Sequence, residues 1–315
     1  MSETFEQHFA QTPEEKPKSL EEIKEERVLA LIGEIRGIKE KIERGELTGG
    51  KAIEGYQRIT ALANKIKKLD ERVGWQLEGR LTEENVLLEY QAGGWINAAD
   101  FSPKGDRVVI GSRDDGMQVI SLTEKDERGR PKVLAEYRVG GVVQAANFSP
   151  EGDRVVIGSD DGKMQVISLT EKDERGEPKV LAEYRAGGYV QAAVFSPKGD
   201  KVVIGSDDDK MVRVISLTEK DKKGNIIPRV LAEYQAGRAV FAANFSSEGD
   251  KVVIGTGDKM QVISLAKKDE KGNIIPRVLA EYQAGGWIQA ANFSPEGDKV
   301  VIGSEDGKMK VLGTP

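Results

Sequence analysis

Short apolar runs that alternate with turns rich in Gly, Pro and Asp recur five times along the chain. In one copy, VQAANF (143–148) leads through a Ser-Pro-Glu-Gly-Asp turn into RVVIGS (154–159), and an Asp-Asp-Gly turn then leads into KMQVISL (163–169). A charged tip follows, and after it comes VLAEY (180–184). β-Branched runs of this length between turn residues are typical of antiparallel strands. Each copy therefore predicts a four-stranded antiparallel unit.

The copies are almost evenly spaced. The phenylalanine of the motif F-S-[PS]-x-G-D marks each copy, and the spacings are 47, 47, 50 and 48 residues for Phe101, Phe148, Phe195, Phe245 and Phe293. A sheet of four short strands cannot bury both of its faces alone, so we expect the copies to stack side by side. Residues 81–315 therefore predict a mainly β domain of five repeats arranged as blades around an axis.

The repeated unit resembles the WD-repeat β-propeller family. The run W-I-Q-A-A-N-F-S-P-E-G-D-K-V-V-I-G-S-E-D-G-K-M-K-V (287–311) follows that family's pattern for the inner three strands almost position by position. The chain departs from the pattern where Gly-Gly replaces Gly-His before the first strand, and where Ile167-Ser168 and its equivalents replace Trp-Asp. Losing all the polar groups of a buried hydrogen-bond network together lowers the stability of a fold much less than losing one group and leaving its partners unpaired. The resemblance implies a five-bladed WD-like β-propeller.

The two ends of the repeat array are each incomplete. The last copy stops after its third strand at Val311-Leu312, whereas NVLLEYQ (85–91) reads as a fourth strand with no others before it. Strand 86–90 is therefore expected to close the last blade, which is the way in which the resembled family closes its ring. The alternative is an open arc of five blades that a second chain completes.

A helical periodicity precedes the repeats, within residues 19–80. Ser19-Leu20-Glu21-Glu22 is a capping box, and the apolar residues after it recur at a spacing of three and four. A second apolar stripe begins at Ile53, after the Gly49-Gly50 break. We expect an antiparallel α-helical hairpin that docks on the propeller or pairs with another chain. Residues 1–18 are polar and are expected to be a disordered tail.

Composition narrows the classes of partner. The 315 residues carry 47 basic and 53 acidic side chains, for a net charge of −6, and this balance disfavours nucleic acid as a partner. The chain starts without a basic segment followed by an apolar run, and no stretch approaches the roughly 18 apolar residues of a membrane span. We expect a soluble, cytoplasmic protein that does not bind membranes.

The sequence offers no constellation for catalysis or metal binding. It contains no cysteine, and its one histidine, His8, lies in the polar tail. Asp100 is the one Asp among five equivalent positions, so the carboxylate pair of a propeller hydrolase is missing. Acidic turns such as Asp160-Asp161 fit hairpin turns better than calcium loops, which need six or more oxygen ligands. We predict no enzyme activity, no cofactor and no metal, and we keep a propeller hydrolase as a less favoured alternative.

Candidate binding residues come from two patterns. The positions just before the first strand of each copy are Trp95, Val142, Tyr189, Ala239 and Trp287. The resemblance implies that they lie beside the acidic turns, near the face on which WD-repeat proteins often bind peptides. The fourth copy differs most from the others, and Arg238 and Phe241 are among its differences. Neutral drift after duplication of the repeat is an alternative explanation for these differences. The predicted partner-binding residues are Trp95, Tyr189, Arg238, Phe241 and Trp287.

Together these features predict a non-catalytic scaffold for protein interactions. Aromatic rings beside carboxylates bind cations, so we expect a protein or peptide partner, with a cationic peptide as the best match. Packing of the tryptophans between blades is the competing interpretation. The alternative function is a self-assembling structural repeat protein, which would form homo-oligomers through the helices or by ring completion.

Overall fold

The computed structural model describes residues 20–48, 51, 54, 58, 59, 62, 88–222 and 224–314. The chain divides into two compact units, Met1–Leu87 and Leu88–Pro315, and each is described by itself. The predicted tail, with His8, lies outside the described residues, as does most of the second predicted helix.

The first unit contains helix α1 (Leu20–Glu43), which confirms the first of the two predicted helices. Val28 and Ile35 form its buried face and pack against Ile59 and Leu62. Ile59 and Leu62 are in helical conformation, but the second predicted helix is described only at such isolated positions. Among the residues described, no helix has the length and apolar character needed to cross a membrane.

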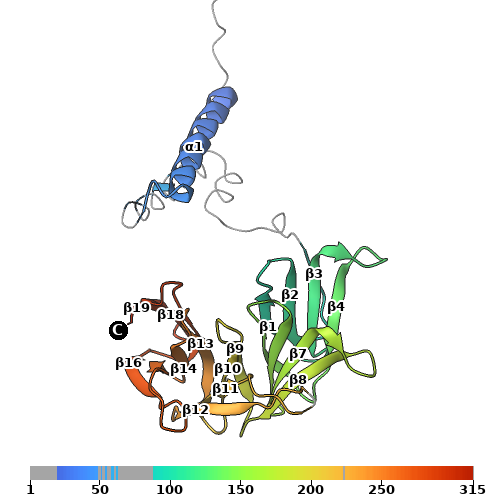
Figure 1. Cartoon of the computed structure of the whole chain (residues 1–315). Coiled ribbons are helices and arrows are strands. Elements are labelled where there is room, and N and C mark those ends of the chain that lie inside the picture. Colours follow the sequence, from blue (N-terminus) through green and yellow to red (C-terminus); the bar gives the residue numbers. More distant parts are fainter. Residues whose placement is uncertain are drawn as a thin grey trace, which may run out of the picture. The chain divides into compact units, whose positions relative to one another are not determined.

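The second unit consists of five antiparallel sheets in the range 88–314, and we number them blades 1 to 5 in chain order (Figure 1). Blade 1 contains β1 (Ile96–Phe101), β2 (Arg107–Ser112), β3 (Met117–Lys125) and β4 (Pro131–Tyr137). Blade 2 contains β5 (Val143–Phe148), β6 (Arg154–Ser159), β7 (Lys163–Lys172) and β8 (Pro178–Arg185). Blade 3 contains β9 (Val190–Phe195), β10 (Lys201–Ser206), β11 (Met211–Ser216) and β12 (Arg229–Gln235). Blade 4 contains β13 (Val240–Phe245), β14 (Lys251–Thr256), β15 (Lys259–Ser264) and β16 (Arg277–Gln283), and blade 5 contains β17 (Ile288–Phe293), β18 (Lys299–Ser304) and β19 (Met309–Gly313).

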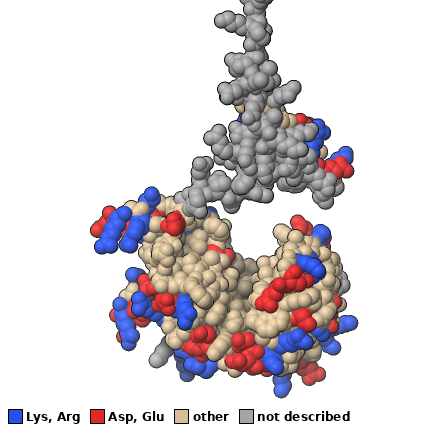
Figure 2. Space-filling model, turned by 180° about the vertical axis from the view of Figure 1, so that it is seen from behind, with Lys and Arg blue, Asp and Glu red and all other residues tan. Residues whose placement is uncertain are grey.

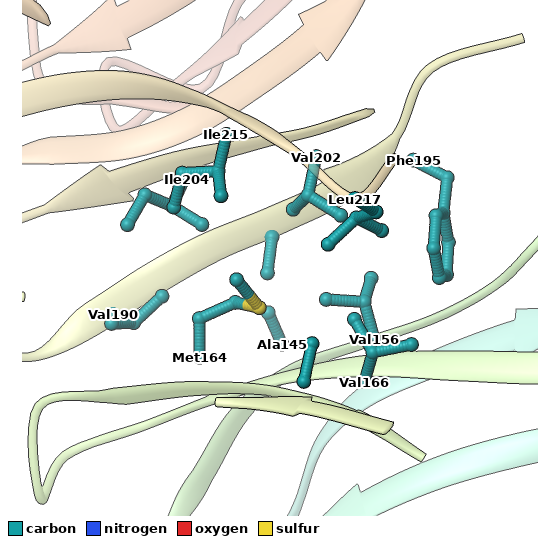
Figure 3. Close-up of a cluster of buried hydrophobic side chains, with 12 residues drawn as sticks. Ala145, Val156, Met164, Val166, Val190, Phe195, Val202, Ile204, Ile215 and Leu217 are labelled. Atoms are coloured by element: carbon teal, nitrogen blue, oxygen red, sulfur yellow. The ribbon is translucent and has the colours of Figure 1, made fainter. Parts of the chain in front are cut away.

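The hydrophobic core lies between the blades. Each blade is a meander whose strands pair in chain order, and consecutive blades pack face to face through their first strands. Figure 3 shows the layer between blades 2 and 3, where Met164 and Val166 of blade 2 face Val190, Ile204 and Ile215 of blade 3. All five side chains are fully buried. Burial of one face on the next blade is therefore what stabilises each sheet.

Each contact between consecutive blades, which we call a joint, contains a glycine socket. A Cβ atom added to Gly205 in β10 would lie 2.5 Å from Cγ1 of Val240, so only glycine leaves room for the buried valine of the next blade. The other joints repeat this arrangement with the pairs Gly111–Val143, Gly158–Val190 and Gly255–Ile288. The socket explains the glycine that recurs near the end of the second strand in the first four copies.

The two ends of the blade array stand apart, so the sheets form an arc (Figures 1 and 2). Blade 5 has three strands. Among the strands described, β19 pairs with β18 and no fourth strand pairs with its other edge. Residues 88–90 of the predicted closing strand 86–90 are not in a strand, and residues 86 and 87 lie outside the described part. Tyr90 and Ala92 pack instead on Ile110 and Ile120 of blade 1. The predicted closed ring is thus not formed within the arc that the structure describes.

Candidate functional site

One end of each blade combines aromatic and acidic residues. The loop before the first strand is tied to the turn between the second and third strands by backbone hydrogen bonds, such as Asp207 N–H to Tyr189 O (3.2 Å) and Glu305 N–H to Trp287 O (2.9 Å). Arg113 N–H donates to Trp95 O in the same way (3.0 Å). We call this end of the blades the turn face, and it brings the predicted aromatic positions beside the acidic turns.

Trp95 and Tyr189 lie on the turn face but belong to separate blades. Trp95, on blade 1, leaves 76% of its surface exposed, and the Arg113 guanidinium lies 5.9 Å from its ring centroid. Trp95 and Asp114 help to line an open depression of about 630 Å³. Tyr189, on blade 3, is half-exposed. The structure does not bring these two rings together with the other predicted residues.

Phe241 and Trp287 meet across the joint between blades 4 and 5. Their ring centroids are 5.4 Å apart and their planes differ by 19°, so the rings are stacked. Phe241 lies in β13 at a position where the other four copies have Asn or Gln. Trp287 still exposes 51% of its surface, so it both packs at the joint and offers area to a ligand. Stacking of this kind holds an exposed ring in a defined orientation.

Arg238 is the third predicted residue at this joint. Its Nη1 lies 3.0 Å from Oδ1 of Asp258 in the neighbouring turn, so the two charges are paired. The carbonyl of Gly257, which precedes Asp258, accepts a hydrogen bond from Ile288 N–H, and this bond ties the turn to the loop that carries Trp287. Arg238, Phe241 and Trp287 therefore form one cluster, which we call the joint 4–5 site.

Carboxylates flank the joint 4–5 site on both blades. Asp258 comes from the turn of blade 4, and Glu305 comes from the turn of blade 5, where it accepts a hydrogen bond from the Gln289 amide (2.9 Å). The backbone N–H of Glu305 donates to Trp287 O, so the turn that carries Glu305 is bound to the loop that carries Trp287. An exposed indole with two nearby carboxylates can bind a guanidinium or ammonium group.

Other turn carboxylates are used in structural hydrogen bonds. Asp209 accepts hydrogen bonds from the Ser206 hydroxyl and from Gly187 N–H (3.2 Å), and it lies 2.6 Å from Nη1 of Arg213. Burial alone would raise the pKa of Asp209, but the bonds from Ser206 and Arg213 lower it below its ordinary value. A Cβ atom on Gly187 would lie 2.6 Å from Oδ2 of Asp209. The carboxylate thus occupies space that a larger residue would need.

This serine–aspartate–glycine network recurs and was not found from the sequence. Equivalent hydroxyl–carboxylate bonds join Ser159 to Asp161 and Ser304 to Asp306. It explains the first glycine of the Gly-Gly pair in these copies, because a Cβ atom on Gly187 or Gly285 would lie 2.6 Å from a carboxylate oxygen of the network. The signal that could have revealed it is a serine at the end of the second strand, followed two or three residues later by aspartate.

Among the described residues, no cluster of three or more His, Asp or Glu side chains could hold a metal ion.

No protein-family model matches the chain, and no curated protein matches it. Among solved structures, the chain is similar to the β-propeller domain of Cps50 (Swd1) from Myceliophteria thermophila, with a TM-score of 0.55 and 17% sequence identity. The similarity covers 72% of this chain and 68% of that chain. Together with the repeated antiparallel sheets, this likeness shows that the chain has a β-propeller fold.

Proposed function

We propose that the protein is a non-catalytic interaction scaffold of the WD type, and that the joint 4–5 site binds a cationic segment of a protein or peptide partner. The observation that carries this proposal is the half-exposed indole of Trp287, which is stacked on Phe241 and lies in a loop that is hydrogen-bonded to the turns of Asp258 and Glu305. The β-propeller fold supports the scaffold role, because the WD-repeat proteins that this chain resembles often bind peptides on one face of their blades.

The ion pair at the site does not prevent binding of a cation. The Arg238 side chain is well exposed, and an exposed ion pair contributes only about 0–1 kcal/mol. A cation over an aromatic face gains roughly 0.5–2 kcal/mol. An arginine or lysine of the partner can therefore replace Arg238 at Asp258 while its alkyl chain or guanidinium covers Trp287.

The other predicted residues extend this proposal. Trp95 and Tyr189 are proposed as secondary contacts on the turn face for a partner that follows the arc. The helical unit is proposed to be a hairpin that docks or assembles, because Ile59 and Leu62 cover the apolar face of α1. Trp95, Tyr189 and the helical unit would contact only a long partner, whereas a short peptide would contact the joint 4–5 site alone.

The test uses short peptides of opposite charge. Acetylated tetra-arginine and tetra-glutamate amides are titrated into the full chain by calorimetry at low and high salt. We expect tetra-arginine to bind with salt-sensitive affinity and Trp287→Ala to weaken it about fivefold, which corresponds to ~1 kcal/mol. Trp95→Ala is the matched control and should change the affinity less than about twofold. Equal binding of tetra-glutamate, or an unchanged affinity of Trp287→Ala, would overturn the proposal.

A further inference from the structure

Blade 5 exposes a face that is buried in every other blade. Met309 of β19 is 68% exposed, whereas the equivalent Met164 of blade 2 is 0% exposed. Val311 is largely exposed, and its equivalent Val166 is fully buried. These side chains point toward the place that a following blade would occupy, and we call this surface the trailing face. It is an apolar surface with no neighbour in the described arc.

Blade 1 exposes the opposite face. Ile96 is 47% exposed although the equivalent Val143 is 0% exposed, and Phe101 is 66% exposed although the equivalent Phe148 is 7% exposed. In blade 2, Val143 and Phe148 pack on blade 1. The exposed residues of blade 1 therefore form a leading face that lacks a preceding blade.

The two faces are complementary in shape. A Cβ atom on Gly303 in β18 would find its nearest neighbour at 3.9 Å, whereas at Gly205 and Gly255 the corresponding distances are 2.5 and 2.6 Å. The socket at Gly303 is thus empty. Ile96 occupies in blade 1 the position of the residues that fill the other four sockets, and Ile288 shows that isoleucine fits such a socket. The unfilled socket and the exposed isoleucine match each other.

Hydrogen bonds at the joints show the same complementarity. The Asn147 amide donates to Ala193 O of the next blade (2.9 Å), and the Asn244 amide donates to Ala291 O (2.8 Å). In blade 5 the equivalent donor is Asn292, and in blade 1 the equivalent acceptor is the carbonyl of Ala99. A joint between these two blades would therefore form the bond that recurs inside the arc.

The segment before blade 1 supplies the strand that blade 5 lacks. The Tyr90 hydroxyl donates to Gln118 Oε1 (3.2 Å), and the equivalent Gln165 contacts the hydroxyl of Tyr137 (3.3 Å), the last residue of the fourth strand of blade 1. Tyr90 therefore lies where the fourth strand of a preceding blade would place its tyrosine. Any blade that seats on the leading face is thus positioned to pair with residues 88–91.

We propose that the occupant of the trailing face is the leading face of a second copy of this chain. Ile96 of one copy enters the Gly303 socket of the other, and the segment that contains residues 88–91 adds to the free edge of β19 as a fourth strand. The predicted closing strand then completes the last blade of a neighbouring chain. Such a head-to-tail contact gives a ring if the rotation closes and an extended assembly if it does not.

A second copy fits the arc better than closure within one chain. The four joints of the arc are close-packed, with fully buried residues such as Val190 and Val240 in their sockets. Bringing the separated ends of one arc together would require these joints to rotate together, and close-packed interiors resist such deformation. A second copy offers the same leading face without any change in these joints.

Complementation between two single variants tests the proposal. Ile96→Glu destroys the leading face and Gly303→Val fills the socket of the trailing face; both positions are open in the arc, so each variant folds. By light scattering on the full chain, we expect the wild type to be at least dimeric and each variant alone to be monomeric. A 1:1 mixture should form dimers and nothing larger, because one intact joint remains possible between the two variants.

The control is Ile227→Glu, which changes an equally exposed isoleucine of blade 3 and should keep the wild-type mass. A wild type that stays monomeric at all concentrations would overturn the proposal, since it would mean that the ends close within one chain or remain free. A mixture that stays monomeric contradicts it as well. Variants that remain oligomeric alone would place the assembly contact elsewhere, in the helical unit for example.

Discussion

A single methyl group added to a joint glycine should have opposite effects inside the arc and at its end. Gly205→Ala introduces a Cβ atom 2.5 Å from Cγ1 and 3.0 Å from Cβ of the fully buried Val240. Carbon atoms in good contact are roughly 3.5–4.0 Å apart, so blade 4 has to move by about 1 Å or Val240 has to leave its rotamer. Gly303→Ala makes the same chemical change where the nearest atom is 3.9 Å away.

The magnitude follows from two opposing terms. Overpacking of a core costs roughly 1–3 kcal/mol, while replacing glycine by alanine gains about 0.4–1 kcal/mol by restricting the unfolded chain. We expect Gly205→Ala to lower the free energy of unfolding by about 1–2 kcal/mol. Gly303→Ala meets no clash and should leave this free energy unchanged or raise it by up to ~1 kcal/mol.

Urea unfolding followed by circular dichroism measures both variants. They are compared in the Ile96→Glu background, so that assembly through the arc ends does not contribute. The midpoint should fall for Gly205→Ala and not for Gly303→Ala, with an unchanged dependence on urea concentration. Equal shifts of the two midpoints would refute the view that the glycine sockets hold the blades together.

Three further substitutions test individual contacts by urea unfolding. Burial raises the pKa of the Asp100 carboxyl group, so the folded state holds the carboxyl proton more tightly than the unfolded state does. Stability therefore falls as the pH rises through the carboxyl range. Asp100→Asn should raise the free energy of unfolding by about 1 kcal/mol at pH 7 and leave it unchanged at pH 3. Burial would raise the pKa of Asp209, but hydrogen bonds, including one from Arg213, lower it. Asp209→Asn should therefore cost about 1–3 kcal/mol at pH 7, and the cost should shrink as the pH falls through the carboxyl range. Tyr137→Phe removes the contact with Gln165 between blades 1 and 2 and should cost about 0.5–1.5 kcal/mol at any pH between 5 and 8; no loss of stability would contradict a role for this contact.

The strands could be predicted from the sequence because their signals are local. The predicted strands 143–148 and 154–159 coincide with β5 and β6. The predicted strand 163–169 extends to Lys172 in β7, because the charged tip continues the hairpin and Lys172 pairs with Pro178 of β8. Turn residues and β-branched runs fix such elements one copy at a time.

Closure of the blades could not be predicted because it is not a local property. Every copy encodes a similar joint, and whether the ends meet depends on a small rotation that accumulates over four joints. The sequence did indicate that strand 86–90 and the last copy are each incomplete, and Tyr90 and β19 reflect this in the structure. Of the two arrangements that the sequence leaves open, a closed ring and an open arc, the described residues form the arc.

The joint 4–5 site was predicted only in part. The sequence marks Phe241 as a difference in the fourth copy and Trp287 as an aromatic residue before a strand. Their stacking arises from the packing of blade 5 on blade 4, which no single copy encodes. The acidic turns were recognised as turns, but their role as hydrogen-bond acceptors for serine and glycine depends on distances that only the folded turn provides, as at Asp209.

Disulfide formation between Ile96→Cys and Gly303→Cys tests most directly whether the arc ends bind each other between chains. The chain has no native cysteine, so the two introduced thiols are the sole reactive pair. In the control pair Gly255→Cys and Ile288→Cys, the Cβ atoms lie about 3.2 Å apart, close to the roughly 3.5–4.5 Å of a disulfide, and an internal bond should form. Under mild oxidation the account predicts covalently linked dimers or larger species for the Ile96–Gly303 pair. A monomer with an internal disulfide, or two free thiols at concentrations where the control is fully oxidised, would contradict it.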